Sequence, residues 1–527
     1  MAAHAGLGIA LALSLAVHAG GQGSAESAAA AGRGRILLVL PFDNRTGQPS
    51  LEWIRKAAPD ILSSRVASAG FAPMSRADRL YALDHLGLPQ GFQPSRASSL
   101  KLAQTLDADS IVVGDYRTDG SGLVAEARIV DVPHMRMSEP VTERGEMRDL
   151  IAVFDSLAWK LTRQLNPGFN VAEETFVAAG SGLRLNAFEQ YIRGITESDQ
   201  AERVRHLQQA VKLSPEFSAA WMALGREDYN GQQYEQASAS FAKVGADNAD
   251  ALEAGFYRGL SLMFSGDYGK AETAFGGVAR VLPLAEVLNN EGVAISRQGH
   301  DGGALFRQAI AADPTKADYH FNLAVSLKRH GNSQEATAEL AQCLKLHSND
   351  SEAQALQTAW KQPAGSVGSA EPLERIERNF DAVAFRQAAV MMDQMEASRL
   401  AALTPQQRAS TLTSQARDYL SRGLLLEAER LYQAAVAADD HTEDAHAGLA
   451  EVRERTGDSA GARKEAQAAL ELKPTAGAYL VLARMDLAAS HLDDASREAN
   501  EALKLNPNSP AAQALLRQLA ARQGQPK

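Results

Sequence analysis

The feature that most constrains this chain is a pattern of residues that recurs about every 34 positions in its central and C-terminal parts. Ala237 and Ala271 are 34 positions apart, and so are Phe241 and Phe275. A repeat of this length is typical of helical hairpins that bury their apolar faces only against neighbouring hairpins. The sequence therefore predicts a continuous stack of hairpins from Leu183 to Arg522.

Small and bulky residues recur at fixed places in this pattern. Small residues let two helices approach closely, whereas bulky ones fill the space between hairpins. The small positions hold Gly225, Gly259, Gly292, Ala324, Ala450 and Ala483, and the bulky ones hold Trp221, Phe241, Phe275 and Phe306. Second helices are expected to end at Pro215, Pro283, Pro314, Pro474 and Pro507.

Together these residues resemble the tetratricopeptide-repeat (TPR) family. The clearest match is Trp221-Met222-Ala223-Leu224-Gly225, followed by Ala237 and Phe241. The resemblance implies an all-α solenoid in two blocks, whose concave face binds a segment of another protein. Block 1 is expected over 183–360, a linker rich in Gly, Pro and Ser over 361–372, and a helical segment with block 2 and a capping helix over 373–522.

Strand signals are concentrated before the repeats, in residues 35–168. Short apolar runs that end in turns indicate strands, and apolar residues at helical spacing indicate helices. Strands are expected over Ile36 to Phe42, Phe71 to Ser75, Asp109 to Tyr116, Leu123 to Val132 and Met135 to Thr142. Helices are expected over Leu51 to Ala69, Arg76 to Leu86, Ser98 to Leu106 and Glu146 to Leu165. This order predicts one small α/β domain.

The same region resembles the TolB amino-terminal-like module, over roughly Arg35 to Asn166. The resemblance rests on Pro41-Phe42-Asp43-Asn44-Arg45-Thr46-Gly47, followed by Leu51-Glu52-Trp53. It implies a small α/β domain of envelope or secreted proteins, without known chemistry of its own. The chain departs from the family's hairpin ending at Asp131-Val132-Pro133-His134, so a different turn is expected there.

The first residues have the character of an export signal. Leu7 to Val17 is an unbroken run of small and apolar residues, and Val17-His18-Ala19 offers a small-x-small cleavage site. The sequence therefore predicts a signal peptide over 1–19, a flexible lead-in over 20–34, and a periplasmic or secreted protein without a lipid-anchor cysteine. The run follows no Lys or Arg, so the alternative is an uncleaved Ala/Gly leader on a cytoplasmic protein. No later segment has the length of a membrane span.

Composition and motifs argue against several other functions. The net charge of −11 disfavours sequence-independent binding of nucleic acid. The single cysteine, Cys343, rules out an internal disulfide, and it is expected to be a small core residue where other repeats carry alanine. His441 and His446 are five positions apart, which suits a metal site poorly. We expect no catalytic residues, no metal and no cofactor.

The residues between the packing positions of the first helices are expected to line the binding face. This set is apolar at its floor and basic at its lip, so it suits an extended segment, or a helix, with acidic flanks. The alternative is that Phe256, Met263 and Phe264 pack internally. A clamp for a terminal carboxylate is not expected, because its usual Lys and Asn slots hold Met222, Phe256 and Phe321. The candidate residues are Met222, Arg226, Tyr229, Phe256, Leu260, Met263, Phe264, Asn289, Arg297, Phe321, Lys328 and Arg329.

The sequence thus predicts an α+β protein, with a small N-terminal α/β domain before an all-α TPR solenoid. Its expected function is that of a non-catalytic scaffold of the bacterial cell envelope, with a partner segment in the concave face. Two alternatives remain: an accessory subunit of an envelope secretion or assembly machine, and a sensor that binds a small ligand through the α/β domain. The partner and the oligomeric state are not indicated.

Overall fold

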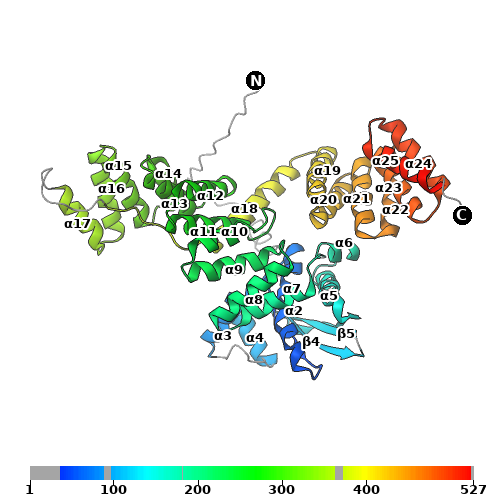
Figure 1. The fold of residues 1–527 in the computed structure, drawn as a ribbon, viewed down its shortest axis with the longest axis horizontal. Helices are drawn as coiled ribbons and strands as arrows, with labels where there is room; N and C mark the ends of the chain where they lie inside the picture. The colour runs from blue at the N-terminus through cyan, green and yellow to red at the C-terminus, as the bar shows by residue number, and fades with distance from the viewer. Residues whose placement is uncertain (1–35, 88–95, 121, 181, 362–371, 524–527) are drawn as a thin grey trace.

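The computed structural model describes residues 36–87, 96–120, 122–180, 182–361 and 372–523. An α/β domain lies below two helical blocks that extend to opposite sides (Figure 1). The predicted order, a small α/β domain and then an all-α solenoid in two blocks, is confirmed. The predicted signal peptide, the lead-in over 20–34 and most of the predicted linker lie outside the described residues.

The α/β domain is built on one mixed sheet. Its strands follow the order β3-β1-β4-β5-β6, with β2 paired to β4 and β7 paired to β5. β1 runs parallel to β3 and β4, whereas β4 and β5 form an antiparallel hairpin in the register Ser110 to Asp131. The strands are β1 (Ile36–Val39), β2 (Asp43–Asn44), β3 (Ala72–Pro73), β4 (Ser110–Asp119), β5 (Gly122–Asp131), β6 (Arg136–Met137) and β7 (Val141–Glu146).

The strand predicted over Met135 to Thr142 is in fact two shorter strands, β6 and β7. Pro140 lies between them and has no N–H to donate to a ladder, so continuous pairing is interrupted there. In the preceding turn, the backbone N–H of His134 donates to Asp131 Oδ1 at 3.1 Å. This side-chain hydrogen bond fixes the turn between β5 and β6.

Helices cover both faces of the sheet. On one face, α2 (Glu52–Ser68) and α5 (Leu150–Leu165) bury their apolar sides against β1, β4 and β5, with Phe42 and Phe154 in edge-to-face contact at 5.6 Å. On the other face, α3 (Arg76–His85) and α4 (Arg96–Thr105) cover Leu38 and Ile111. A further short helix, α6 (Glu173–Ala178), had no sequence prediction.

Both blocks consist of antiparallel helical hairpins. Block 1 contains α7 (Leu185–Thr196), α8 (Gln200–Leu213), α9 (Ser218–Asn230), α10 (Tyr234–Phe241), α11 (Ala251–Phe264), α12 (Tyr268–Val281), α13 (Ala285–Arg297), α14 (Gly303–Ala312), α15 (Ala317–Arg329), α16 (Ser333–Leu346) and α17 (Ser351–Trp360). Block 2 contains α19 (Pro405–Ser421), α20 (Leu425–Ala438), α21 (Glu443–Thr456), α22 (Ser459–Leu472), α23 (Ala476–Ala488), α24 (Leu492–Leu505) and α25 (Pro510–Gln523).

The small positions of the repeat face the bulky ones. A Cβ placed on Gly259 would lie 2.6 Å from the ring of Phe275, and one on Gly292 would lie 2.8 Å from the ring of Phe306. Such distances are far inside van der Waals contact, so only glycine lets these helix pairs approach this closely. The repeat in the sequence therefore marks the positions at which paired helices contact each other most closely. Cys343 is fully buried beside Phe321 and Leu340, as predicted for a core residue.

The α/β domain touches both blocks. α7 of block 1 packs against α2, and α6 packs against α20 and α21 of block 2. Leu426 of α20 belongs to the same apolar core as the sheet and α2. The buried Glu429 accepts a hydrogen bond from the backbone N–H of Ala172 at 3.1 Å. These contacts seat block 2 on the α/β domain.

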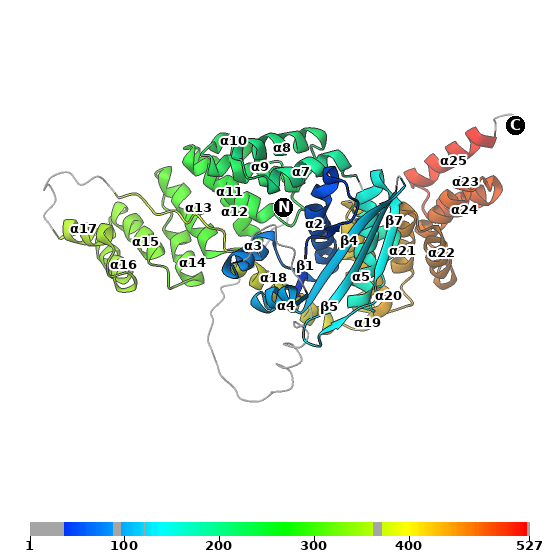
Figure 2. The same ribbon diagram turned by 90° about the horizontal axis from the view of Figure 1, so that it is seen from below.

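Between the blocks, the chain doubles back. After α17, residues 373–381 run in extended form along α15 and α13 to the long helix α18 (Ala382–Ala401), as Figure 2 shows. We call residues 373–381 the return segment. They lie where the sequence predicted the start of a helical segment. The helix begins only at Ala382 because the residues before it bond to block 1 instead of to one another.

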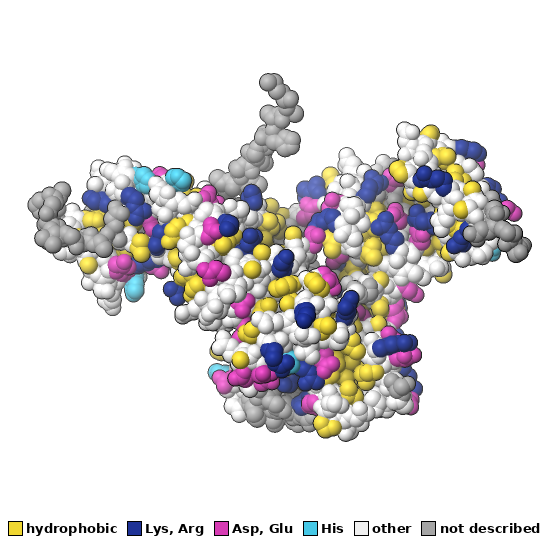
Figure 3. Space-filling model, in the orientation of Figure 1, with side chains coloured by type: hydrophobic (Ala, Val, Ile, Leu, Met, Phe, Trp, Pro, Cys, Tyr) yellow, Lys and Arg dark blue, Asp and Glu magenta, His cyan; other side chains and the backbone are white. Residues whose placement is uncertain are grey.

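On the face seen in Figure 3, basic and acidic side chains are interspersed over both blocks. Within the described part of the chain, no helix combines the length and apolar character that a membrane span requires.

Candidate functional site: the first-helix face of block 1

The candidate site is the face formed by the first helices α11, α13 and α15, together with α17, along which the return segment lies. We call this the first-helix face. Its polar side chains belong to one block, and the segment that they hold comes from residues at least 23 positions away in sequence. The contacts therefore show which groups of this face hold a segment of the same chain.

Asparagine side chains hold the backbone of the segment. Asn322 Nδ2 donates to the carbonyl oxygen of Arg375 at 2.7 Å, and Asn322 Oδ1 accepts from the Arg375 N–H at 2.6 Å. Asn290 makes the same pair of bonds with Glu377, at 2.7 and 2.9 Å. Each amide thus imitates a neighbouring β-strand, which exchanges N–H and C=O bonds with one residue of its partner.

Asn289 locks these amides in place. It donates to the carbonyl oxygen of Arg375 and to Asn290 Oδ1, both at 3.1 Å, and it accepts from Asn322 Nδ2 at 2.8 Å. Asn289, Asn290 and Asn322 are all fully buried. Because a buried amide without partners is costly, the backbone of the segment stabilises this network by supplying its hydrogen-bond partners.

A basic pocket holds Glu374. Its carboxylate lies 2.6 Å from Arg329 Nη1 and 3.2 Å from Arg297 Nε, and it also accepts a hydrogen bond from Ser296. The side chain of Glu374 is completely buried. A buried carboxylate requires such charged partners, so this pocket selects an acidic side chain.

An acidic pocket holds the next residue, Arg375. Its guanidinium lies 3.7 Å above the ring of Phe321 and forms ion pairs with Asp350 at 2.6 Å, Asp318 at 2.7 Å and Glu352 at 2.8 Å. Hydrogen bonds from Arg375 lower the pKa of Asp350 to about 2. Burial acts to lower the pKa of Arg375, but the three carboxylates outweigh it and raise that pKa. A planar cation over an aromatic ring fits arginine better than lysine.

The other end of the segment is apolar. The ring of Phe380 lies 5.6 Å from that of Phe256, and Ile376 packs against the same core. Arg378 lies 5.1 Å above the ring of Phe264.

The contacts follow the repeat. In α13 and α15, the residue two positions before the small residue bonds to the segment's backbone: Asn290 before Gly292, and Asn322 before Ala324. The residue five positions after the small residue is Arg297 or Arg329, and both bind Glu374. In block 2, the corresponding positions before Ala450 and Ala483 hold Gly448 and Val481, which have no amide to offer.

Six of the candidate residues from the sequence contact the return segment. Asn289, Arg297 and Arg329 bond to it, Phe321 lies under Arg375, and the rings of Phe256 and Phe264 face Phe380 and Arg378. Whether these residues also bind a partner protein stays a prediction.

The other six candidates make other contacts. Met222, Leu260 and Met263 are buried between helices, because they point into the core and not along the face. Arg226 pairs with Glu253, Lys328 lies 5.4 Å above the ring of Trp360, and Tyr229 belongs to an aromatic cluster with Tyr234 and Tyr257.

The residues that sequence reasoning missed are mainly those that read the backbone and the arginine. They are Asn290, Asn322, Ser296, Asp318, Asp350 and Glu352, together with the return segment itself. A signal for two of them was present: Asn290 and Asn322 stand at the same repeat position. Each of the two directly follows a residue that the sequence pattern indicates for the face, Asn289 or Phe321.

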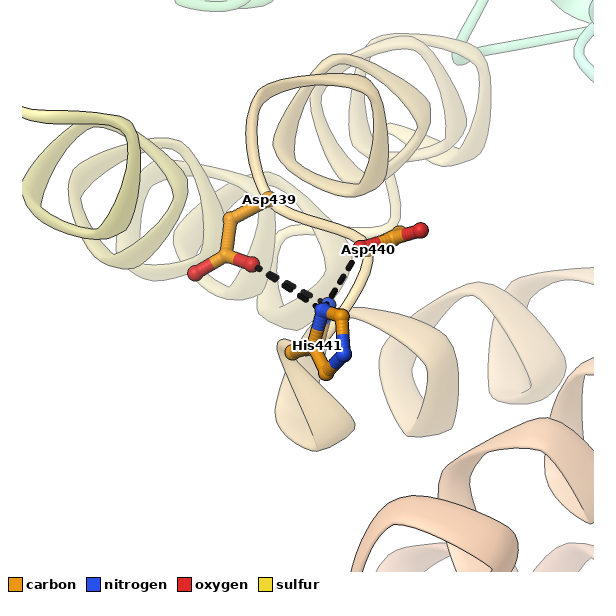
Figure 4. Close-up of side chains that lie close together, drawn as sticks. All are labelled: Asp439, Asp440 and His441. Atoms are coloured by element: carbon orange, nitrogen blue, oxygen red, sulfur yellow. Dashed lines mark hydrogen bonds and ion pairs between the residues drawn. The ribbon is translucent and has the colours of Figure 1, made fainter.

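A group of possible metal ligands lies in the turn between α20 and α21. Donor atoms of Asp439, Asp440 and His441 lie within 4.8 Å of one another (Figure 4). His441 Nδ1 is 2.7 Å from Asp440 Oδ1, and both side chains are 79% exposed. An ordinary surface ion pair accounts for this arrangement. His446, the other histidine considered from the sequence, instead contacts Glu465 in the core of block 2.

Comparisons with known proteins agree with the helical architecture. Two family models, each described as tetratricopeptide repeat, match residues 305–338 and 413–477. The comparison with curated protein sequences gave no match.

Several solved structures are similar to parts of the chain. MamA 41-end from Desulfovibrio magneticus RS-1 is 20% identical, with 32% of this chain and 100% of that chain covered and a TM-score of 0.29. YrrB, described as a TPR protein with an unusual peptide-binding site, is 15% identical, with 38% and 99% covered and a TM-score of 0.30. The C-terminal domain of LpoB from Escherichia coli is 19% identical, with 22% and 84% covered and a TM-score of 0.20. The two family matches fall in different blocks, so each helical block contains a segment that matches a tetratricopeptide-repeat model.

Proposed function

We propose that this protein is a non-catalytic interaction scaffold of the bacterial cell envelope, and that its first-helix face holds an extended segment of a partner protein. The observation that carries the proposal is the pair of backbone-reading amides, Asn290 and Asn322, each bonded to one residue of an extended chain. Side chains that satisfy both polar groups of a backbone residue give affinity for any extended segment, and pockets beside them give specificity.

The envelope setting is supported by the first residues of the sequence. The apolar run Leu7 to Val17 and the site Val17-His18-Ala19 have the pattern of an export signal. Sequencing the N-terminus of the protein purified from its host tests this part. A start near Gly20, in the periplasmic or secreted fraction, is expected, and an intact Met1 in the cytoplasmic fraction would refute it.

The interaction is tested by photo-cross-linking in the native host. A photoreactive amino acid replaces Lys328, a half-buried residue of α15 whose ammonium lies 5.4 Å above the ring of Trp360 on α17. The control position is Thr337, an exposed residue of the second helix α16. The proposal expects a cross-linked protein that is specific to position 328 and lost in the Asn290→Ala/Asn322→Ala double variant. The same products at both positions, or products that persist in the double variant, would contradict it.

One observation favours a second function, the sensing of a small ligand. A cavity of about 580 Å³ between the α/β domain and block 1 is lined by Asp60, Arg76, Arg79, Tyr191, Phe217 and Asp250. Burial raises the pKa of Asp60 to about 6, and Asp60 Oδ2 is buried without a hydrogen-bond partner among the described residues. A thermal-shift screen with small anions and zwitterions tests this function. Stabilisation that is lost in the Arg76→Gln variant supports it, and no stabilising compound counts against it.

A further inference from the structure

The return segment is bound more specifically than a linker requires. A connection from α17 to α18 needs only to be long enough. Residues 361–381 are many more than a short turn contains. Yet Glu374 is fully buried between two arginines, and Arg375 meets three carboxylates. Long charged side chains lose conformational entropy when they are fixed, so such contacts are favourable only where the pockets are formed in advance.

The pockets can be formed in advance because block 1 builds them without the segment. Arg297 and Arg329 lie at the C-terminal ends of α13 and α15. Asp318 lies at the N-terminal end of α15, and Asp350 directly precedes α17. The face therefore presents a basic pocket, two amides and an acidic pocket in a fixed order. A segment that binds must present the complementary order.

We propose that the return segment is a resident ligand, and that the partner of block 1 carries an extended segment of the same chemistry, which binds by displacing residues 373–381. The partner segment would present an acidic residue directly followed by arginine, an acidic residue two positions after the arginine, and an aromatic residue three positions later. These are the positions of Glu374, Arg375, Glu377 and Phe380. This inference rests on the proposed function, because it names the partner's chemistry and the condition for its binding.

The pockets account for this specificity. An alanine in place of the first acidic residue would leave Arg297 and Arg329 buried without their carboxylate, and a neutral residue in place of the arginine would leave Asp318 and Asp350 close together without a cation. Lys316 lies 3.5 Å from Glu377 and adds a weaker preference for a second acid. The aromatic residue is favoured because the ring of Phe256 on α11 lies 5.6 Å from that of Phe380.

Being tethered, the resident segment competes strongly. A segment joined to its site by a short linker acts at an effective concentration on the order of millimolar. A free partner segment of equal intrinsic affinity therefore binds weakly until the resident segment is released or until further contacts add to its affinity. The first-helix face would therefore bind mainly a partner that is multivalent or locally concentrated.

The proposal is tested with a labelled peptide of residues 372–382, blocked at both ends, added to the full chain. Two forms of the chain are compared by fluorescence anisotropy: the natural chain and the Glu374→Ala/Arg375→Ala variant, which removes the resident segment's anchors and leaves every pocket residue intact. We expect the peptide to bind the variant at least about tenfold more tightly than the natural chain. Peptides with the Glu and Arg replaced by Ala should not bind.

A further variant shows where the peptide binds. Adding Asn290→Ala and Asn322→Ala to the opened chain should abolish peptide binding while the helical circular dichroism stays unchanged. If the opened variant does not fold, the single change Arg375→Gln, which keeps Glu374, serves in its place. Equal affinity for the natural and opened chains, or no binding to any opened chain, would overturn the resident-ligand proposal.

The peptide result and the cross-linking result can be separated. Specific cross-links from position 328 without any peptide binding would keep the scaffold function and refute the resident ligand. Peptide binding without cross-links would establish an exchangeable face and count against a partner in the host.

Discussion

Asn290 and Asn322 occupy the same position of two successive repeats, and each exchanges two hydrogen bonds with one residue of the return segment. Asn290 bonds to Glu377, and Asn322 bonds to Arg375. Each lies two residues before the small residue of its helix, Gly292 or Ala324. The step from Asn290 to Asn322 along the solenoid therefore corresponds to two residues of an extended chain, in the direction opposite to the order of the repeats.

This relationship predicts the effect of removing one amide. In the Asn322→Ala variant, the N–H of Arg375 loses its acceptor and the buried neighbours of Asn322 lose a partner, at a cost of about 1–3 kcal/mol. Hydrogen exchange at the Arg375 amide should become about tenfold faster or more. The measurement is hydrogen–deuterium exchange of the segment by mass spectrometry. Asn500→Ala is the control, because Asn500 is exposed and bonds only within its own helix α24. Unchanged protection at Arg375 would mean that the amide does not hold the segment.

The same residues show how much of the first-helix face could be predicted from the sequence. The repeat in the sequence located the small and bulky positions, and hence the helices that form the face, because their packing is local to each hairpin. It also indicated Arg297 and Arg329. It could not indicate the return segment, since Asn322 and Asn290 meet residues 53 and 87 positions away. No periodic pattern connects a solenoid to an extended chain outside its repeats. The contact of Leu426 with the α/β core was hidden for the same reason.

The close contact between Gly259 and Phe275 predicts a matched pair of glycine variants. Gly259→Ala places a methyl group 2.6 Å from the Phe275 ring, and such overpacking costs about 1–3 kcal/mol. Gly277→Ala, on α12, meets only the end of Arg280 at 3.9 Å, so the gain in helix propensity should stabilise the protein by about 0.5–1 kcal/mol. Thermal unfolding followed by circular dichroism should give a lower midpoint for the first variant and an equal or higher one for the second. A lower midpoint in both would show that this small position is not special.

Leu426 provides the test of how block 2 is seated on the α/β domain. It belongs to α20 but is buried in the core formed by the sheet and α2. Leu426→Ala should weaken that contact by about 2–5 kcal/mol, because a cavity opens between the two parts. Small-angle X-ray scattering should then give a larger radius of gyration, while helical content is kept. Leu505→Ala, at a side chain that is 49% exposed on α24, should change neither. An unchanged radius for Leu426→Ala would mean that other contacts, such as that of Glu429 with the backbone of Ala172, suffice to hold block 2.

His446 and Glu465 predict a pH dependence for block 2. His446 Nδ1 lies 2.7 Å from Glu465 Oε2, and this hydrogen bond raises the pKa of His446 above its usual value of 6.5. Burial acts to raise the pKa of Glu465, but His446 and Arg453 outweigh it and lower that pKa below 4.5. A raised histidine pKa gives stability that is complete below pH 6.5 and is lost as the pH rises through the raised value. A lowered glutamate pKa gives stability above pH 4.5 that is lost in stronger acid.

The protein should therefore be more stable at about pH 6 than at about pH 8, by on the order of 1 kcal/mol from this pair. His446→Gln keeps the size and a hydrogen-bond donor but does not titrate, so the difference in urea unfolding between the two pH values should shrink. His441→Gln is the matched control, because that side chain is 79% exposed in the neighbouring turn and its loss should leave the pH dependence as it was. Equal pH dependence in the natural chain and the His446→Gln variant would show that the ion pair with Glu465 contributes no net stability, as happens when the cost of burying two charges cancels their attraction.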